Sequence, residues 1–305
     1  MEGLEVSIGS LRLRNPVLLA SGCVGYGEEI AQFVDLAELG GIVVKGLYMS
    51  PRVGNPPPRT WETPSGMLNS IGLPGIGIRA FVAEKLPPLL ERRATVIVNV
   101  CGSTEEEYED VSRVCDETDG VHALELNISC PNIRANGRCP GMSQQETYAL
   151  VTRVRRVTQK PLVVKLSPNV TDIAAIAMSA QEGGADALSV INTVLGMAIN
   201  IETGEPRLAT GMGGLSGPAI RPIALRMVYQ VAQVVEIPVI GAGGIVEWRD
   251  AIEFFMAGAS AVQVGTANFV NPRASVEILQ GIAEYLARHN KRLPDVVGQC
   301  RIAPR

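Results

Sequence analysis

The feature that most constrains the fold is a unit that recurs along the chain: a short aliphatic run, a polar or Gly-bearing loop, and an amphipathic helical stretch. The eight runs are Val17 to Ala20, Ile42 to Lys45, Val96 to Val100, Ala123 to Leu126, Leu162 to Leu166, Leu188 to Ile191, Val239 to Gly241 and Ala261 to Val264. Buried parallel strands are typically continuous runs of this kind. Eight strand–helix repeats without a long linker predict a single (β/α)8 TIM barrel over residues 1–305, rather than two doubly wound domains.

Local signals around these runs agree with that architecture. The alternating segments Glu5 to Ile8 and Leu11 to Arg14 flank Gly9-Ser10, which suits a type II′ turn, so an N-terminal β-hairpin is expected to cap one end of the barrel. The helix signals are possible capping boxes at Ser103-x-x-Glu106 and Ser143-x-x-Glu146, Pro222 in a first turn, apolar sets at helical spacing from Ile173 to Ala180 and from Ala224 to Val231, and Gly40, Gly183 and Gly258 at expected helix ends.

Composition excludes several classes of function. With 46% hydrophobic but only 4% aromatic residues, the core must be built mainly from Val, Ile, Leu and Ala. A net charge of -4 and the lack of any Lys/Arg cluster argue against a nucleic-acid partner. Because no run reaches about 18 apolar residues and no signal peptide is recognisable, we expect a cytoplasmic protein without a membrane span. The six cysteines form no C-x-x-C pair, so no disulfide framework or metal site is expected.

In a barrel of this kind the chemistry collects at the carboxyl ends of the strands. The polar, charged and glycine residues at those positions are Ser21, Lys45, Gly46, Asn99, Asn127, Lys165, Asn192, Thr193, Gly243, Gly244, Gly265 and Thr266. A Lys inside an apolar strand is costly unless it has a partner, so Lys45 and Lys165 are either ligand contacts or members of structural ion pairs. The glycines after the seventh and eighth runs predict a phosphate-bearing ligand, because such loops offer backbone N–H groups to phosphate oxygens.

Two long insertions and one short loop complete the candidate face. Residues Gly46 to Gly75 and Asn192 to Ile220 are expected to be long lids or binding loops at the carboxyl-end face, with partial disorder as the alternative. In the stretch Glu125 to Asn132, Pro131 predicts a stiff, extended loop that would hold the Cys130 thiol still. Cys130 is either a catalytic thiol or a small buried hydrophobe.

With these residues in view, the chain resembles the class 1 dihydroorotate dehydrogenases over nearly its full length, and most closely the class 1B catalytic subunit. The motifs that carry the resemblance are Ala20-Ser21-Gly22, Met67-Leu68-Asn69-Ser70-Ile71-Gly72-Leu73, Asn127-Ile128-Ser129-Cys130-Pro131-Asn132, Val164-Lys165-Leu166-Ser167-Pro168-Asn169, Gly214-Leu215-Ser216-Gly217-Pro218 and Gly265-Thr266-Ala267. The resemblance implies FMN as the phosphate ligand, (S)-dihydroorotate as the substrate, and a role in de novo pyrimidine biosynthesis.

The resemblance also implies roles for individual residues. Cys130 would be the general base, Lys45 would lie between substrate and flavin, and Lys165 would face the flavin ring edge. The implied substrate contacts are Lys45, Asn69, Ser70, Ile71, Gly72, Leu73, Asn127, Asn132, Asn192 and Thr193. The implied flavin contacts are Ser21, Lys45, Gly46, Asn99, Asn127, Lys165, Ile191, Gly217, Gly243, Gly244, Gly265 and Thr266.

Two departures from the family pattern affect the loops around the site. Pro74-Gly75 replaces the usual Gln-Asn, and Asn136 to Cys139 replaces a His-Gly-Gly sequence, which also brings a second thiol near Cys130. Neither histidine supports a triad, because His122 precedes a strand at the opposite rim and His289 is assigned to the last helix.

Class 1B enzymes pass electrons to NAD through a second subunit that carries FAD and a 2Fe–2S cluster, in a heterotetramer around a homodimer core. This chain has no cluster ligands or dinucleotide fingerprint of its own, so such a partner is expected. The alternatives are a class 1A-like homodimer using fumarate, a phosphate-binding barrel lyase or isomerase with Lys45 or Lys165 as Schiff-base group, and a non-catalytic barrel subunit.

Overall fold

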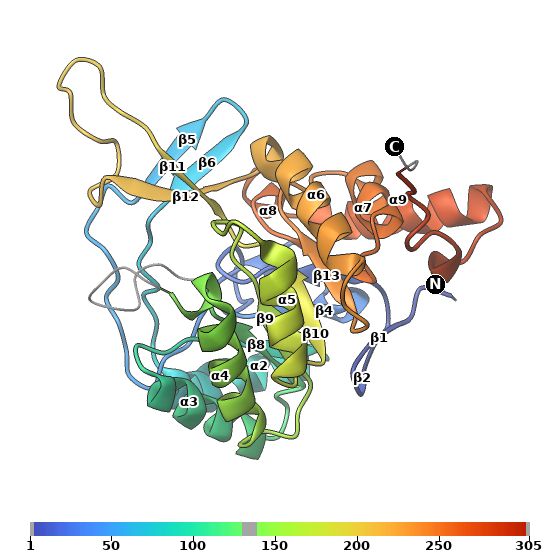
Figure 1. Ribbon diagram of the computed structural model, residues 1–305, viewed down its shortest axis with the longest axis horizontal. Helices are drawn as coiled ribbons and strands as arrows, with labels where there is room; N and C mark the ends of the chain where they lie inside the picture. Colours follow the sequence, from blue (N-terminus) through green and yellow to red (C-terminus); the bar gives the residue numbers. More distant parts are fainter. Residues whose placement is uncertain (1–2, 130–138, 303–305) are drawn as a thin grey trace.

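The computed structural model describes residues 3–129 and 139–302, and within this part of the chain eight parallel strands close into a barrel (Figure 1). In order around the barrel, the strands are β10 (Ala187–Val190), β13 (Val239–Ala242), β14 (Ala261–Val264), β3 (Val17–Leu19), β4 (Gly41–Val43), β7 (Val96–Val100), β8 (Ala123–Asn127) and β9 (Leu162–Lys165). Each predicted run is one of these strands, with bounds within two residues. The predicted (β/α)8 barrel is therefore confirmed.

Helices cover the outside of the barrel. The longer ones are α3 (Glu105–Glu117), α4 (Gln144–Arg155), α5 (Ile173–Glu182), α6 (Arg221–Ala232), α7 (Trp248–Met256) and α9 (Ala274–Arg288); the shorter ones are α1 (Ile78–Ala80), α2 (Leu86–Glu91) and α8 (Ala267–Val270), with the π-helical turn η3 (Phe81–Lys85) and the 3₁₀ turns η4 (Pro140–Met142), η5 (Pro218–Ile220) and η6 (Leu293–Asp295). The predicted apolar faces of α5 and α6 are buried. In the described residues no helix is long and apolar enough to span a lipid bilayer.

The first repeat departs from the expected pattern, because the segment between β3 and β4 contains no α-helix. It holds only the 3₁₀ turns η1 (Ile30–Gln32) and η2 (Leu36–Glu38), so Gly40 follows a short turn rather than a helix. Much of this segment is used by a glycine-rich turn in which Gly22, Gly25 and Gly27 all have positive φ, at 81°, 54° and 94°. These glycines occupy the start of the segment, and the residues after them form only the two short 3₁₀ turns.

Helix starts were predicted with mixed accuracy. Ser143 is the N-cap of α4, and its hydroxyl accepts a hydrogen bond from the Glu146 N–H at 3.4 Å. For α3 the predicted capping box was placed one residue early. Thr104 is the N-cap and accepts from the Glu107 N–H at 3.2 Å, while the Glu107 carboxylate accepts from the Ser103 N–H at 2.7 Å.

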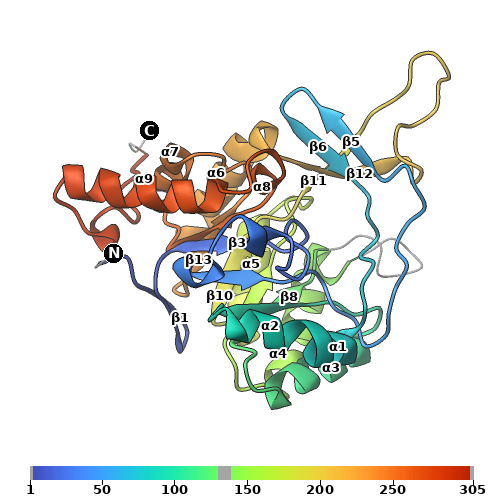
Figure 2. The same ribbon diagram turned by 180° about the vertical axis from the view of Figure 1, so that it is seen from behind.

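The N-terminal hairpin closes the amino end of the barrel, as predicted. Its strands are β1 (Val6–Ile8) and β2 (Leu11–Leu13), and Gly9 has a φ of 55° at the turn. Ile8 and Leu13 are buried against an apolar layer formed by the first inward-facing residues of the barrel strands. Figures 1 and 2 show the hairpin and the sheet that contains β5 and β6 on opposite sides of the barrel.

The two long insertions lie at the carboxyl-end face as expected, but they form strands, so the alternative of partial disorder is wrong. Each contributes two strands to one antiparallel sheet in the order β11-β12-β6-β5. The strands are β5 (Thr60–Thr63), β6 (Gly66–Asn69), β11 (Val194–Met197) and β12 (Met212–Ser216). The pairing Gly214 with Asn69 joins the insertions directly, so each one supplies the hydrogen-bonding edge that the other lacks.

Candidate functional site

A layer of polar side chains lies inside the barrel, above the apolar layer that the hairpin closes. Side chains of one strand alternate between the two faces, so the residue two positions after an inward-facing one also points inward. In β3 and β13 this next residue is Ala20 or Ala242, whereas in five other strands it is a buried polar residue; these are Asn99, Glu125, Lys165, Ser189 and Gln263. All of them are buried, with exposed fractions between 0% and 5%.

Glu125 is the centre of this layer. Its carboxylate accepts hydrogen bonds from the amide of Asn99 at 2.7 Å, the hydroxyl of Ser189 at 2.7 Å and the amide of Gln263. The Lys165 ammonium lies 3.6 Å from the same carboxylate, and the Ser21 hydroxyl lies at 3.4 Å. A buried carboxylate with this many donors is stabilised as the charged form.

The electrostatic balance at Glu125 follows from these contacts. Burial would raise the pKa of the Glu125 carboxyl, but the charge of Lys165 and the hydrogen bonds from Gln263, Ser189 and Asn99 outweigh burial and bring this pKa below its ordinary value. Of the two alternatives for Lys165, the structural ion pair is confirmed, and ligand contact stays a prediction. Its ammonium is in a structural ion pair, and its side chain also lines the cavity above the polar layer.

That cavity opens at the carboxyl ends of the strands and consists of two adjoining parts, with about 530 and 1120 Å³ of space outside protein atoms, including the space open to solvent. Ser21, Asn192, Thr193 and Thr266 line both parts, which makes the space continuous. The predicted site residues that line it are Ser21, Lys45, Gly46, Asn69, Ile71, Leu73, Asn99, Asn127, Lys165, Ile191, Asn192, Thr193, Gly217, Gly243, Gly244, Gly265 and Thr266. Residues from all eight barrel units are thus gathered around one space.

Two predicted residues do not reach it. Asn69, Ile71 and Leu73 line the cavity, whereas Ser70 and Gly72 alternate with them and do not. The chain leaves β6 at Asn69 and turns at Gly72 and Leu73, whose φ values are 75° and 50°. Ser70 is 8% exposed, and its hydroxyl has no hydrogen-bond partner among the described residues.

The predicted base and one predicted amide, Cys130 and Asn132, lie outside the described residues. The residues on either side of that segment are anchored. The Ser129 hydroxyl donates to the side-chain oxygen of Asn127 at 2.9 Å and accepts from the amide of Asn192 at 2.5 Å. Cys139, the second thiol noted in the sequence, is buried at the N-cap of η4.

Lys45 lies at the wider part of the cavity with Arg59. Among the described residues its ammonium has no ion-pair or hydrogen-bond partner, in contrast to Lys165. Burial lowers the pKa of Lys45 most, the nearby charge of Arg59 lowers it further, and Glu29 opposes both. A lysine left in this state is poised to contact an anionic or carbonyl-bearing ligand.

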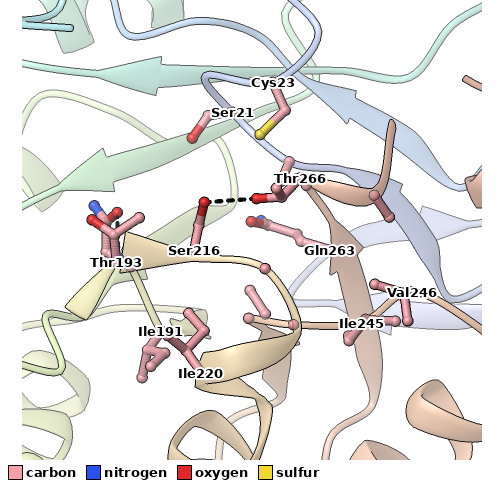
Figure 3. Close-up of a pocket in the computed structure, with 18 of the residues that line it drawn as sticks. Ser21, Cys23, Ile191, Thr193, Ser216, Ile220, Ile245, Val246, Gln263 and Thr266 are labelled. Carbon is pink, nitrogen blue, oxygen red and sulfur yellow. Dashed lines mark hydrogen bonds between the residues drawn. The ribbon is translucent and has the colours of Figure 1, made fainter. Parts of the chain in front are cut away.

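The narrower part of the cavity is lined by backbone rather than by charges. Gly243 and Gly244 have φ values of 120° and 78°, conformations that favour glycine. Within the described chain no hydrogen bond uses the N–H groups of Gly243, Gly244, Gly265 or Thr266. Figure 3 shows this region, where the Thr266 hydroxyl donates to Ser216 at 2.8 Å. Unused N–H groups at glycine turns are the donors that phosphate binding requires.

Sequence reasoning missed several residues of this site. Glu125 was visible as a carboxylate inside an aliphatic run, which is the same signal that singled out Lys45 and Lys165. Cys23 and Gln263 line the cavity as well, and Figure 3 shows both. Burial raises the pKa of the Cys23 thiol to about 11, with Lys165 opposing, so this thiol is protonated at neutral pH.

The two histidines are remote from the cavity, as predicted. His122 precedes β8, and its Nδ1 accepts a hydrogen bond from the Val96 N–H at 3.0 Å at the amino rim. His289 is the C-cap of α9 and stacks on Tyr285. Neither contributes to chemistry at the carboxyl-end face.

Comparison with known proteins identifies the family. A family model described as dihydroorotate dehydrogenase matches residues 3–286. The proteins named dihydroorotate dehydrogenase B (NAD(+)), catalytic subunit, of Thermodesulfovibrio yellowstonii and Bacteroides thetaiotaomicron are 54% and 50% identical to this chain. These matches cover 98% and 99% of this chain, and 99% and 100% of the relatives.

A solved structure shows the same fold. The dihydroorotate dehydrogenase of Eimeria tenella, in complex with ferulenol, superposes with a TM-score of 0.80 at 24% sequence identity, over 97% of this chain and 88% of that chain. At that identity the likeness concerns the fold alone. The full-length family match and the close relatives carry the assignment: this chain is an oxidoreductase of the dihydroorotate dehydrogenase family, and its resemblance to the class 1B catalytic subunits is confirmed.

Proposed function

We propose that the chain catalyses the FMN-dependent oxidation of (S)-dihydroorotate to orotate in de novo pyrimidine biosynthesis. The observation that carries this proposal is the set of three amides and one lysine around a single cavity: Asn69, Asn127, Asn192 and Lys45. A dihydropyrimidine presents alternating C=O and N–H groups, and a side-chain amide both donates to the first and accepts from the second. Lys45 adds the positive charge that suits the substrate carboxylate.

The remaining part of the cavity fits FMN. The unused N–H groups of Gly243, Gly244, Gly265 and Thr266 would hold its phosphate. Lys165, Asn99 and Ser21 would face its ring from the polar layer, and Gly217 and Ile191 would complete the contacts. When bound, FMN supplies the acceptor for the hydride that leaves C6 of the substrate.

The protein itself must remove a proton from C5, and Cys130 is the proposed base. A base must be held within hydrogen-bonding reach of the proton that it takes. The residue before Cys130 meets that need at one end, because Ser129 is fixed by Asn127 and Asn192. These two amides therefore serve twice, as substrate contacts and as supports for the start of the catalytic loop.

We infer that electrons leave through a partner subunit with FAD and a 2Fe–2S cluster, which passes them to NAD, and that the assembly is a heterotetramer around a homodimer of this chain. The names of the relatives support this, because each is called the catalytic subunit of an NAD(+)-linked enzyme. A class 1A-like homodimer that reduces fumarate is the competing assignment. The class 1B relatives at about half identity favour the partner.

The first test is the identity of the cofactor. Purified protein should be yellow and should release FMN on denaturation, with about one FMN per chain. Chromatography against FMN, FAD and riboflavin standards distinguishes the three. A colourless protein that FMN does not turn yellow would contradict the proposal, and a borohydride-trapped lysine adduct would favour the lyase alternative instead.

A further inference from the structure

Resting on the proposed function, we propose that Glu125 is a positioning residue of the flavin site: it holds Lys165 and Asn99 at the cavity floor and offsets the Lys165 charge, which lowers the reduction potential of the bound flavin. Glu125 does not line the cavity and touches no ligand-facing space. Its effect must therefore pass through the side chains that it binds.

The geometry makes Glu125 the common partner of the cavity floor. It is 0% exposed, and one carboxylate oxygen accepts from Asn99 at 2.7 Å and lies 3.6 Å from the Lys165 ammonium. Lys165 also donates to Ser21 and to the Gln263 carbonyl oxygen, each at 3.3 Å. These bonds direct the ammonium from three sides. Without the carboxylate, Lys165 would be left with only neutral partners among the described residues.

The sign of the expected effect follows from charge. Reduction adds electrons to the flavin, so a nearby cation favours the reduced form and raises the potential. A carboxylate beside that cation cancels much of its field, and burial strengthens both interactions because the interior screens charge weakly. Removing the Glu125 charge while keeping Lys165 should therefore shift the flavin potential to a more positive value.

A purely structural role predicts something different. Ser189 donates to the other Glu125 oxygen at 2.7 Å, is 0% exposed, and does not line the cavity. It thus matches Glu125 in burial and network membership but carries no charge. If Glu125 serves only packing and hydrogen bonding inside the barrel, Ser189→Ala and Glu125→Gln should both lower thermal stability and leave the flavin reduction potential unchanged.

The experiment is an equilibrium reductive titration of the flavin-loaded chain against a reference dye. Glu125→Gln should give a more positive midpoint than the wild type, while Glu125→Asp, which keeps the charge, and Ser189→Ala should stay at the wild-type value. A wild-type midpoint in Glu125→Gln, or the same shift in all three variants, would overturn the proposal.

A second pair of variants applies where Glu125→Gln does not fold. Lys165→Gln leaves the carboxylate without its cation and should lower the midpoint, and adding Glu125→Gln to it should raise the midpoint again toward the wild-type value, because the negative charge is then gone as well. A double variant with the midpoint of Lys165→Gln would overturn the proposal. Failure of the proposed function is separable, because it would appear as wild-type protein that binds no flavin.

Discussion

Two lysines at strand ends illustrate how local partners decide what a residue can do. Lys165 is almost fully buried, beside the Glu125 carboxylate, so its charge is compensated and its position is fixed. Lys45 is half-buried at the wider part of the cavity and, in the described residues, has no such partner. We therefore propose that Lys165 forms a fixed electrostatic floor and that Lys45 contacts the reacting ligand directly.

Cys130→Ser should leave FMN bound but slow flavin reduction by about 10²- to 10⁴-fold, the usual contribution of a positioned general base. A serine hydroxyl is a far weaker acid than a thiol and supplies almost no base at neutral pH. Stopped-flow absorbance after mixing with dihydroorotate measures the rate. Cys139→Ser, which changes the neighbouring buried thiol, is the control and should reduce at the wild-type rate; a normal rate in Cys130→Ser would remove that thiol from the mechanism.

Lys45→Met should reduce turnover by about 10²- to 10³-fold while the protein retains its FMN, because it removes a charge directed at the substrate and keeps the shape of the side chain. FMN content and activity per bound FMN are measured separately. Lys85→Met is the control, since the Lys85 ammonium pairs with Glu28 at 2.9 Å on the surface. Equal losses of FMN and of activity in Lys45→Met would place Lys45 at the cofactor rather than the substrate.

The chemical type of most site residues was predictable from sequence because strand ends of a barrel converge. The glycines, lysines and amides that follow the aliphatic runs line one cavity in the structure. Glu125 stands two residues before Asn127, but its place in the site was not predicted. Its carboxylate contacts side chains from four other strands, and the local sequence does not show those contacts. Contacts such as Glu125 with Gln263, 138 residues apart, are set by barrel closure and have no local signal.

At the scale of elements, the loop after β13 is shaped by two glycines. A Cβ on Gly244 would lie 2.7 Å from the backbone N of Arg221, at a φ of 78°. Gly204, in the β11–β12 connection, has a similar φ of 73° but open space around it. Comparing alanine substitutions at Gly244 and Gly204 therefore separates two effects: the strain of the left-handed backbone, which both share, and the steric crowding, which only Gly244 has.

Gly244→Ala should weaken FMN binding, because the loop must shift and its N–H groups move with it. Gly204→Ala should cost roughly 1–2 kcal/mol of stability from the left-handed conformation alone and leave FMN affinity unchanged. Titration of the apoprotein with FMN, followed by flavin fluorescence, gives both affinities. Unchanged FMN affinity in Gly244→Ala would mean that the phosphate binds elsewhere.

Strands and helices were predicted correctly where a local sequence pattern specifies them, and not where their formation depends on distant segments. The eight strands follow from aliphatic runs of three to five residues, and the hairpin follows from alternation around Gly9. The sheet of β5, β6, β11 and β12 could not be predicted, because its central pairing joins two insertions that lie far apart in sequence. In the first repeat, where Gly40 was expected to end a helix, three glycines with positive φ are followed only by 3₁₀ turns.

At the scale of the whole molecule, the barrel is closed at one end and open at the other. The hairpin fills the amino end with Ile8 and Leu13, and the carboxyl end holds the cavity beneath the sheet built by the insertions. The closed end can therefore be packed for stability, because the residues of the candidate site lie at the other end. It also leaves the cavity open at the carboxyl-end face, where we propose that substrate binds.

The purified chain alone should reduce an artificial dye with dihydroorotate but should not reduce NAD, because NAD reduction is proposed to need the FAD and iron–sulfur partner. Steady-state assays with a dye, NAD and fumarate decide this. Adding the partner subunit should restore NAD reduction. Rapid fumarate reduction by the chain alone would support the class 1A-like assignment, and NAD reduction by it alone would contradict both.

The central claim is that this cavity joins dihydroorotate oxidation to a bound flavin, and anaerobic mixing tests it most directly. Adding (S)-dihydroorotate to the yellow, oxygen-free protein should bleach the flavin absorbance with the appearance of about one orotate per flavin, and the (R) enantiomer should leave the spectrum unchanged. A flavin that stays oxidised in the presence of (S)-dihydroorotate, in protein that a chemical reductant readily bleaches, would contradict the account.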